Sequence, residues 1–193
     1  MLSLPALKGR GFPRKIDEDT ADPFEHSELQ RIAKVKSRRP QDTHLVMFAS
    51  WSGLSLSEVM ALAWEDVETE TWQLKVRRAK VDPHYKVPKE RSRVRIVELI
   101  DPAIHWLQQQ MPYTMMLPQQ EVSVRQRDNI TIRADEVRFV FMNGTGEQQT
   151  PWHDPSLRRW YTDLLVKAKV RHRGPNQCRH TFASQALSNY VPM

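Results

Sequence analysis

The sequence lacks the residues that disulfides and membrane spans require. A single cysteine, Cys178, stands among 193 residues, which excludes an internal disulfide framework and a site of several thiolates. No apolar run approaches the roughly 18 residues of a membrane span, and Pro5 breaks a start too short for a secretory signal. We therefore expect one domain, or one domain with an arm, in the reducing cytoplasm.

Metal and nucleotide sites also lack their usual patterns. The seven histidines form neither H-x-x-x-H nor H-E-x-x-H, and no second thiol stands near Cys178 and His180. The phosphate loops G-x-x-x-x-G-K and G-x-G-x-x-G are absent from the sequence. Neither a metal nor a nucleotide cofactor is expected.

Positive charge is concentrated in two segments. The chain has a net charge of +6 and a pI of about 9.6. Residues 75–95 carry nine Lys/Arg against two acidic residues, and residues 158–180 carry seven against one, which leaves −7 on the rest. If folding joins the two segments, they fit a surface that faces nucleic-acid phosphates. Two separate solvated faces are the alternative. A membrane surface fits less well because neither segment has a Trp/Phe/Leu face.

Apolar spacing and capping residues predict a mainly helical domain. Residues 1–22 are interpreted as an arm or linker, since proline and glycine break every period there, and residues 23–193 as the folded domain. Helices are predicted over residues 29–33, 41–52 (buried on all sides), 55–63 (with a Ser55/Glu58 capping box), from 101, from 154 and over 179–189.

The predicted strands form a small sheet between the helices. They cover residues 72–78, 93–99 and 137–142, with a proline-containing hairpin arm between the first two. Residues 112–135 are polar and are predicted to be an irregular insertion. Because no βαβ alternation is present, we expect a mainly α fold with a small antiparallel β-sheet (α+β) and no doubly wound sheet.

The start of the last helix is the strongest candidate site. Arg179 and His180 follow Gly174 and Pro175, where the unpaired N–H groups of a helix start favour an anion and a guanidinium grips two phosphate oxygens. An arginine that pairs with a carboxylate elsewhere is an equal alternative. Cys178 beside these charges would favour a thiolate nucleophile, although a lone cysteine there is more often a small packed residue.

Four segments of the chain also form an ordered pattern. They are Pro23-Phe24, Ser52-Gly-Leu-Ser-Leu-Ser-Glu58 with Ala61-Leu-Ala-Trp-Glu-Asp-Val67, Tyr85-Lys-Val-Pro-Lys89 with residues 93–99, and Arg179-His-Thr-Phe-Ala-Ser184. In this order they resemble the tyrosine recombinases of the phage-integrase type: the start of the catalytic domain, the first box, the lysine-bearing hairpin, and the arginine–histidine box. The resemblance spans roughly residues 23–193 and implies the DNA breaking–rejoining fold.

The resemblance also implies a reaction on DNA without metal or nucleotide. In the family a tyrosine attacks a DNA phosphate and forms a 3′-phosphotyrosyl link, two arginines and a histidine hold the phosphate, and a hairpin lysine protonates the departing 5′ oxygen. By position, Arg179 is the second arginine. Lys89 is the best match for the lysine, and Lys80 and Lys86 are its rivals.

Two positions depart from the family pattern. Ser55 stands where the first arginine should be, and Asn176 stands where the histidine should be. Asparagine can donate a hydrogen bond to a phosphate but cannot shuttle a proton at neutral pH, and serine carries no charge. The family's nucleophilic tyrosine lies beyond the 14 residues that follow Arg179, and Tyr190 is interpreted as a core residue.

We therefore expect an incomplete catalytic domain of a site-specific recombinase, which does not cleave DNA alone. Double-stranded DNA is the expected partner, and the sequence leaves open whether the intact parent forms a homo-oligomer (tetramer) on it. The predicted DNA contacts are Lys80, Lys86, Arg91, Arg93, Arg171, Arg173 and His180. A degenerate relative that binds DNA without chemistry is the alternative, which Ser55 and Asn176 favour, and a hydrolase that uses Cys178 is a distant third.

Overall fold

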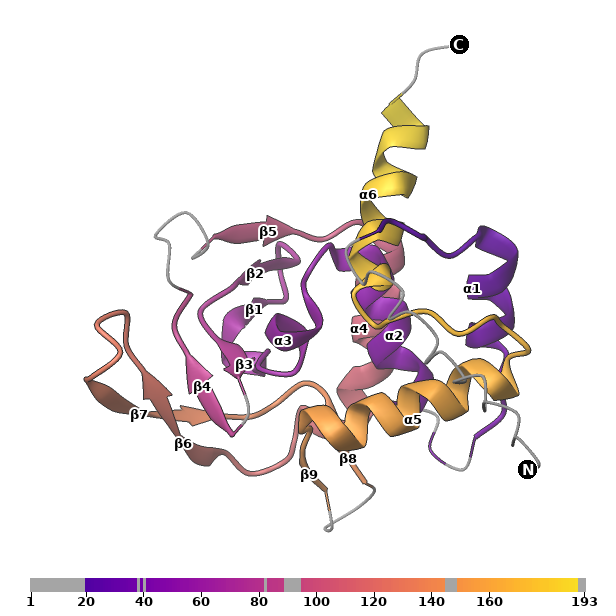
Figure 1. The fold of residues 1–193 in the computed structure, drawn as a ribbon. Helices are drawn as coiled ribbons and strands as arrows, with labels where there is room; N and C mark the ends of the chain where they lie inside the picture. The colour runs from indigo at the N-terminus through magenta and orange to yellow at the C-terminus, as the bar shows by residue number, and fades with distance from the viewer. Residues whose placement is uncertain are drawn as a thin grey trace, which may run out of the picture.

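The computed structural model describes residues 20–37, 39, 41–81, 83–88, 95–144 and 149–190, without the side chains of Asp42, Asn189 and Tyr190. Figure 1 shows helices gathered on one side of the molecule and short strands on the other. No helix among these residues is both long and apolar enough to span a membrane.

The helical side is built around one buried helix. Its helices are α1 (His26–Ala33), α2 (Gln41–Ser52), α4 (Asp101–Thr114), α5 (Asp154–Lys167) and α6 (Gln177–Tyr190). The middle helix, α2, packs against α1, α4 and α6, and Val46, Phe48 and Ala49 are almost fully buried on its different faces. The predicted helix at 41–52 is thus confirmed, because a segment apolar on all sides is stable only with neighbours all round it.

Helix starts follow their capping signals closely. The predicted capping box is present before α3 (Leu56–Val59): Ser55 Oγ accepts from the backbone N–H of Glu58, and Glu58 accepts from the backbone N–H of Ser55. The helix is shorter than predicted and gives way to the 3₁₀ turn η1 (Trp64–Asp66). Proline in the first turn begins both α4 and α5, as predicted.

In the described part of the chain the strands form two larger sheets and one short ladder. The first sheet has the order β1 (Val67–Glu68), β2 (Gln73–Lys75), β5 (Ile96–Glu98), all antiparallel. The second has the order β3 (Ala79–Val81), β4 (His84–Lys86), β6 (Gln120–Arg125), β7 (Ile132–Val137). In this sheet β4 and β6 run parallel. The ladder joins β8 (Met142–Asn143) to β9 (Thr150–Pro151). The pairing of β2 with β5 confirms the predicted sheet, and β3 and β4 form the predicted hairpin arm.

Two predictions for the middle of the chain are wrong. Residues 112–135 are no irregular insertion, because they complete α4 and form most of the β6–β7 hairpin. Residues 137–142 are not one strand either: β7 ends at Val137, Phe139 makes an isolated bridge with Ala63, and β8 begins at Met142. The sequence analysis missed the alternation of apolar and polar residues in this hairpin, because β6 places charged and polar residues on its open face.

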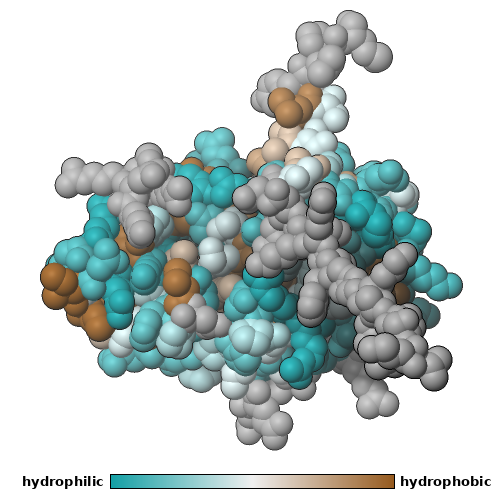
Figure 2. All heavy atoms as spheres, in the orientation of Figure 1, coloured by the Kyte–Doolittle hydropathy of each residue, from teal (hydrophilic) through white to brown (hydrophobic). Residues whose placement is uncertain are grey.

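Apolar side chains form two cores. The larger core lies between the helices, and a smaller one joins the second sheet to the segment after α3 through Ala61, Tyr85, Val124, Val137 and Phe139. Some apolar surface stays open: Figure 2 shows it at the outer end of the β6–β7 hairpin and on α6, where Ile130 and Leu187 are exposed. Hydrophilic residues cover most of the remaining face in that view.

A close approach fixes α6 against the end of α2. Gly53 follows α2 with φ of +68°, a left-handed conformation that suits glycine. A Cβ at this position would lie 2.6 Å from Cδ1 of Phe182, which belongs to α6. The missing side chain therefore lets the Phe182 ring pack directly on the turn between α2 and α3.

We expect Gly53→Ala to lower the free energy of unfolding by about 2–4 kcal/mol, because the methyl group both overpacks the Phe182 contact and strains a positive φ. Urea titration followed by circular dichroism measures the loss. In a Phe182→Leu background, the same substitution should cost only the backbone part, about 1–2 kcal/mol. Equal costs in both backgrounds would show that the ring does not set the constraint.

Candidate functional site

One pocket of about 330 Å³ is lined by four separate parts of the chain. Three of them contain or adjoin the family-like segments, and the fourth is α5. We call it the central pocket. Its polar lining comes from α3, β3, the start of α5 and the turn before α6, and consists of Ser57, Lys80, Asp154, Arg158 and Asn176. Folding therefore brings two of the predicted site residues, Lys80 and Asn176, to the same pocket.

Lys80 is held in place by its own hairpin. Its Nζ lies 3.3 Å from the carbonyl oxygen of Pro83 and 4.2 Å from the centre of the Tyr85 ring. Tyr85 is buried and stacks on Phe139, so the ring is a fixed support. Lys80 pairs across the hairpin with Tyr85, whereas Lys86 is the residue after Tyr85 and faces the opposite side of the sheet. Lys89, Arg91 and Arg93 lie outside the described residues.

Arg158 is a pocket residue that the sequence analysis did not single out. Its Nε lies 2.7 Å from Oδ2 of Asp154, one helical turn earlier, so the start of α5 presents an ion pair to the pocket. Both residues are partly or fully exposed. The signal was present in the basic segment 158–180, but nothing in the sequence showed which arginine of the segment faces the pocket.

Ser55 lies beside the pocket at the start of α3. Its Oγ is 3.1 Å from Oγ of Ser57, which lines the pocket. Glu58 connects this turn to the start of β5. Its carboxylate accepts hydrogen bonds from the Ser55 N–H at 2.8 Å and from the Arg95 guanidinium at 3.0 and 3.4 Å. Burial raises the pKa of Glu58, but the hydrogen bonds from Arg95 and Ser55 outweigh burial and hold the pKa below its usual value.

Arg179 and His180 lie in the first turn of α6. The backbone N–H of Arg179 donates to the carbonyl of Asn176 at 3.0 Å, so Arg179 stands one turn beyond a pocket residue. Its side chain is exposed. Among the described residues that line the central pocket, the turn before α6 contributes Pro175 and Asn176, and Arg179 is not one of them.

Two of the predicted DNA contacts form ion pairs within the domain. Arg173 is 8% exposed and pairs with Glu28 at 2.9 Å and with Asp22 at 3.1 Å, while Arg171 pairs with Asp22 at 2.8 Å. Burial raises the pKa of Glu28, but the hydrogen bond from Arg173 outweighs it and the pKa is lowered. These arginines join α1 to the segment before α6, and their positions give the predicted contacts to DNA no support.

The segment before α1 is also tied to α6. The Gln177 amide donates to the carbonyl of Thr20 at 3.0 Å and accepts from the Asp22 N–H at 2.7 Å. One turn on, Thr181 Oγ1 accepts from the Phe24 N–H at 2.8 Å. The described part of the predicted arm is therefore bound to the body of the domain at the helix that carries Arg179.

Cys178 is not placed as a nucleophile would be. Its side chain is buried, and burial raises the pKa of the thiol to about 11, although hydrogen bonds with Ser50 and Tyr161 partly oppose this. The packed-cysteine interpretation holds, and the hydrolase that would use Cys178 has no structural support.

Solved structures of known proteins share the fold of this chain. The fold is that of the XerA recombinase (TM-score 0.61, 16% identity, 88% of this chain and 52% of that one) and of the Tn1549 transposon integrase in complex with transposon right end DNA (TM-score 0.65, 16% identity, 91% and 56%). The predicted fold class, mainly α with small sheets in a tyrosine-recombinase core, is confirmed.

The sequence comparison gives the family. The pattern of the phage integrase family matches residues 22–193, and the chain belongs to this family. It is 30% identical to prophage integrase IntR of Escherichia coli K12 over 178 residues, which are 91% of this chain and 43% of that protein. It is 27% identical to the putative defective protein IntQ of the same organism, with 91% and 45% covered. The chain thus spans less than half the length of these two relatives.

Because so little of the Cys178 thiol is ionised below pH 11, we expect Ellman's reagent at pH 8 to label almost none of the native protein within minutes. The same protein in 6 M guanidinium chloride should react fully, which controls for an oxidised thiol. Rapid labelling of the native protein would contradict the buried position.

Proposed function

We propose that this chain forms the phosphate-binding part of the catalytic domain of a site-specific DNA recombinase, an integrase. The observation that carries the proposal is the central pocket, where the first box, the lysine hairpin and the turn before the arginine–histidine helix meet although they are far apart in sequence. The solved Tn1549 integrase contains DNA, and the basic segments of this chain are those expected of a DNA-binding relative.

In this proposal the described residues hold and activate one phosphodiester of double-stranded DNA. Asn176 donates a hydrogen bond to a phosphate oxygen and Arg179 adds a guanidinium from the next turn. A hairpin lysine protonates the departing 5′ oxygen: Lys89 by the resemblance, and Lys80 as the alternative that the pocket supports. Tyr85 and Tyr161 are buried, so neither is proposed as the nucleophile that forms the 3′-phosphotyrosyl link. A tetramer on DNA is proposed for the intact parent.

Arg95 is proposed to supply the charge that Ser55 lacks. Its guanidinium binds the Glu58 carboxylate through Nη1 and Nη2, and the same carboxylate accepts the Ser55 backbone N–H. The carboxylate thus holds a cation next to the position of the missing arginine. This assignment favours a competent enzyme over a relative that only binds DNA.

Salt dependence tests the DNA-binding part of the proposal. We expect fluorescence anisotropy with a labelled 30-bp duplex to show affinity falling by about 10³ between 50 and 200 mM salt, as six phosphate contacts predict. Lys80→Gln should reduce the slope by about one contact, whereas Lys169→Gln, on an exposed turn outside the pocket, should leave it unchanged. A flat salt response of the unaltered chain would contradict DNA binding through these residues.

An exchange of charge between two positions tests the role of Arg95. In the intact parent, Arg95→Gln should slow strand cleavage by about 10²–10³, the cost of one oxyanion donor, and Arg95→Lys should not restore it. Placing the guanidinium at the family position, in Ser55→Arg with Arg95→Gln, should recover much of the rate.

The controls separate the outcomes. Arg95→Gln can weaken folding through Glu58, so Glu58→Gln with Arg95→Gln removes the unpaired carboxylate, and circular dichroism reports the folded fraction. Full cleavage by folded Arg95→Gln would refute the assignment of Arg95, and no cleavage by the unaltered parent would favour the relative without chemistry.

A further inference from the structure

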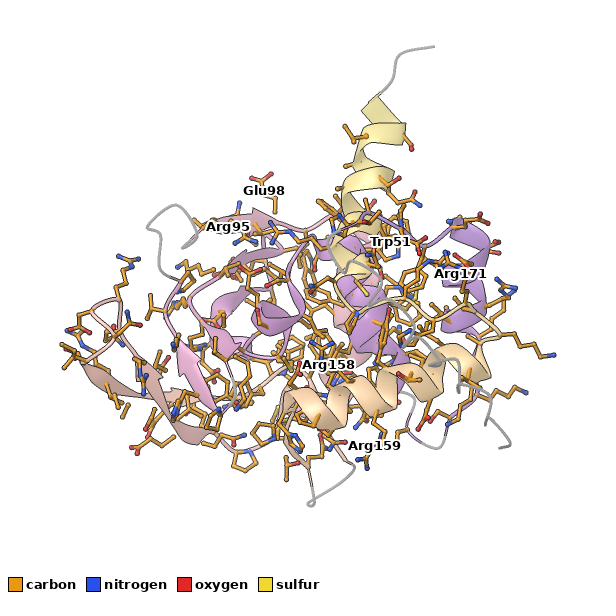
Figure 3. The ribbon with its side chains drawn as sticks, in the orientation of Figure 1. Trp51, Arg95, Glu98, Arg158, Arg159 and Arg171 are labelled. Carbon is orange, nitrogen blue, oxygen red and sulfur yellow. The ribbon has the colours of Figure 1, made fainter. Side chains whose placement is uncertain are left out.

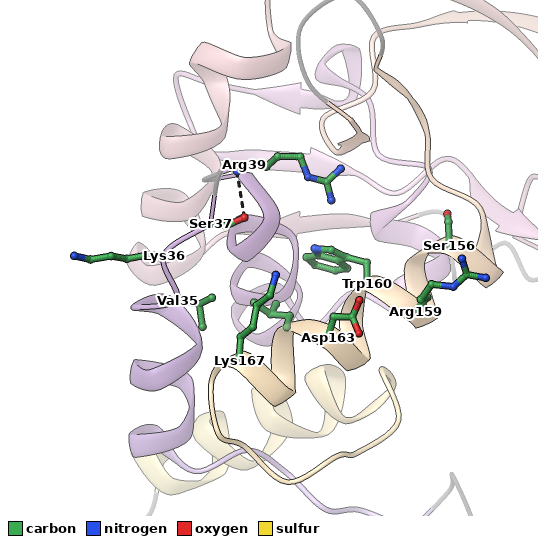
Figure 4. Close-up of a pocket in the computed structure, with 10 residues that line it drawn as sticks. Val35, Lys36, Ser37, Arg39, Ser156, Arg159, Trp160, Asp163 and Lys167 are labelled. Atoms are coloured by element: carbon green, nitrogen blue, oxygen red, sulfur yellow. Dashed lines mark hydrogen bonds between the residues drawn. The ribbon is translucent and has the colours of Figure 1, made fainter.

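A second and larger cavity lies on the opposite flank of α5. This groove of about 710 Å³, which we call the outer groove, runs between α5 and the segment after α1 (Figure 4). The residues that matter for its chemistry are Lys36, Ser37, Arg39, Arg159, Trp160 and Lys167. None of the described residues that line it belongs to a family-like segment.

The outer groove has an excess of positive charge. Lys36 and Arg39 stand on one wall, Arg159 and Lys167 on the other, and Asp163 is the one acidic residue among the lining residues described. No described carboxylate lies within 4.0 Å of the charged nitrogens of Lys36, Arg159 or Lys167. The charges of Lys36, Arg159 and Lys167 repel one another, and an anion in the groove relieves that repulsion.

The other polar groups of the groove are mainly hydrogen-bond donors in fixed positions. Trp160 is half-buried and packs on Trp152 with ring centres 5.1 Å apart, and its indole N–H only donates. Arg39 is oriented by Asn143, whose Oδ1 lies 3.1 Å from Nη1, and Figure 4 shows its guanidinium above the Trp160 ring. A ligand with several negatively charged acceptor oxygens fits such a lining.

The position of α5 points to DNA as the source of those oxygens. Consecutive arginines of α5 line the two cavities: Arg158 the central pocket and Arg159 the outer groove. They project about 100° apart round the helix, and Figure 3 shows them above and below α5 in that view. An α-helix with its side chains is about 10–12 Å across, and the major groove of DNA is about 12 Å wide. A duplex with one strand at the central pocket therefore presents its other strand on the far flank of α5.

We propose that the outer groove binds backbone phosphates of the DNA strand opposite the strand held in the central pocket. The inference rests on the proposed function, since it places a second contact on the same duplex. Arg159 and Lys167 contact phosphate oxygens from α5, and Lys36 and Arg39 contact them from the facing segment. Such contacts add affinity and orientation without reading the base sequence.

A pair of matched variants tests the outer groove. Arg159→Gln with Lys167→Gln removes two charges from the groove. Lys34→Gln with Lys169→Gln removes two exposed charges from neighbouring positions outside both cavities. With the labelled 30-bp duplex, the groove variant should reduce the salt slope by about two contacts and the control variant should not. All four sites are exposed, and thermal melting confirms that both variants are folded.

The outcomes distinguish this inference from the proposed function. If the unaltered chain binds the duplex with a steep salt slope and the groove variant matches the control, the outer groove does not contact DNA and the inference is overturned while the proposed function stands. If the unaltered chain does not bind the duplex, the proposed function fails first. A poly-glutamate probe supplies the last comparison: groove-dependent binding of that probe, with an unchanged slope on DNA, would identify an acidic protein as the occupant and overturn the proposal.

Discussion

The packing of Phe182 on Gly53 is the constraint on which the candidate site depends. Gly53 ends α2 and precedes the turn that carries Ser55, while Phe182 lies one turn after Arg179 in α6. The absence of one side chain therefore sets how closely the first box approaches the arginine–histidine helix. Both residues are partly buried, and a Cβ on Gly53 would overlap the Phe182 ring unless the ring moved. A shift there would separate Ser57 from Asn176, which line the same pocket.

Local signals were sufficient to predict most of the helical framework. The capping box of Ser55 and Glu58 and the prolines at the starts of α4 and α5 act within one turn, so the sequence around them contains all the information required. The apolar α2 was equally clear. The β6–β7 hairpin was not, because β6 is stabilised by parallel pairing with β4, some 40 residues away, and places polar residues on its open face.

The sequence motifs predicted only part of the candidate site. The motifs singled out Lys80 and Asn176, and the fold brings both to the central pocket. The motifs could not distinguish arginines that form ion pairs within the domain from arginines that line a surface cavity. Arg173 and Arg159 belong to the same basic segment, yet Arg173 is buried against Glu28 and Asp22, whereas Arg159 faces the outer groove. The difference lies in which carboxylates the fold brings near each guanidinium, and that is a property of tertiary structure.

The departure at Ser55 shows why a missing charge need not mean a missing function. A phosphate responds to the position of a positive charge, and the element that carries the charge makes no difference to the interaction. Arg95 comes from the strand side of the domain, but Glu58 holds its guanidinium beside the turn where the arginine of the family would begin. The same carboxylate closes the capping box of α3, so the position of Arg95 is coupled to the stability of that turn. A sequence comparison by position records only the serine, whereas the fold shows that the carboxylate bound to the Ser55 N–H also binds the Arg95 guanidinium.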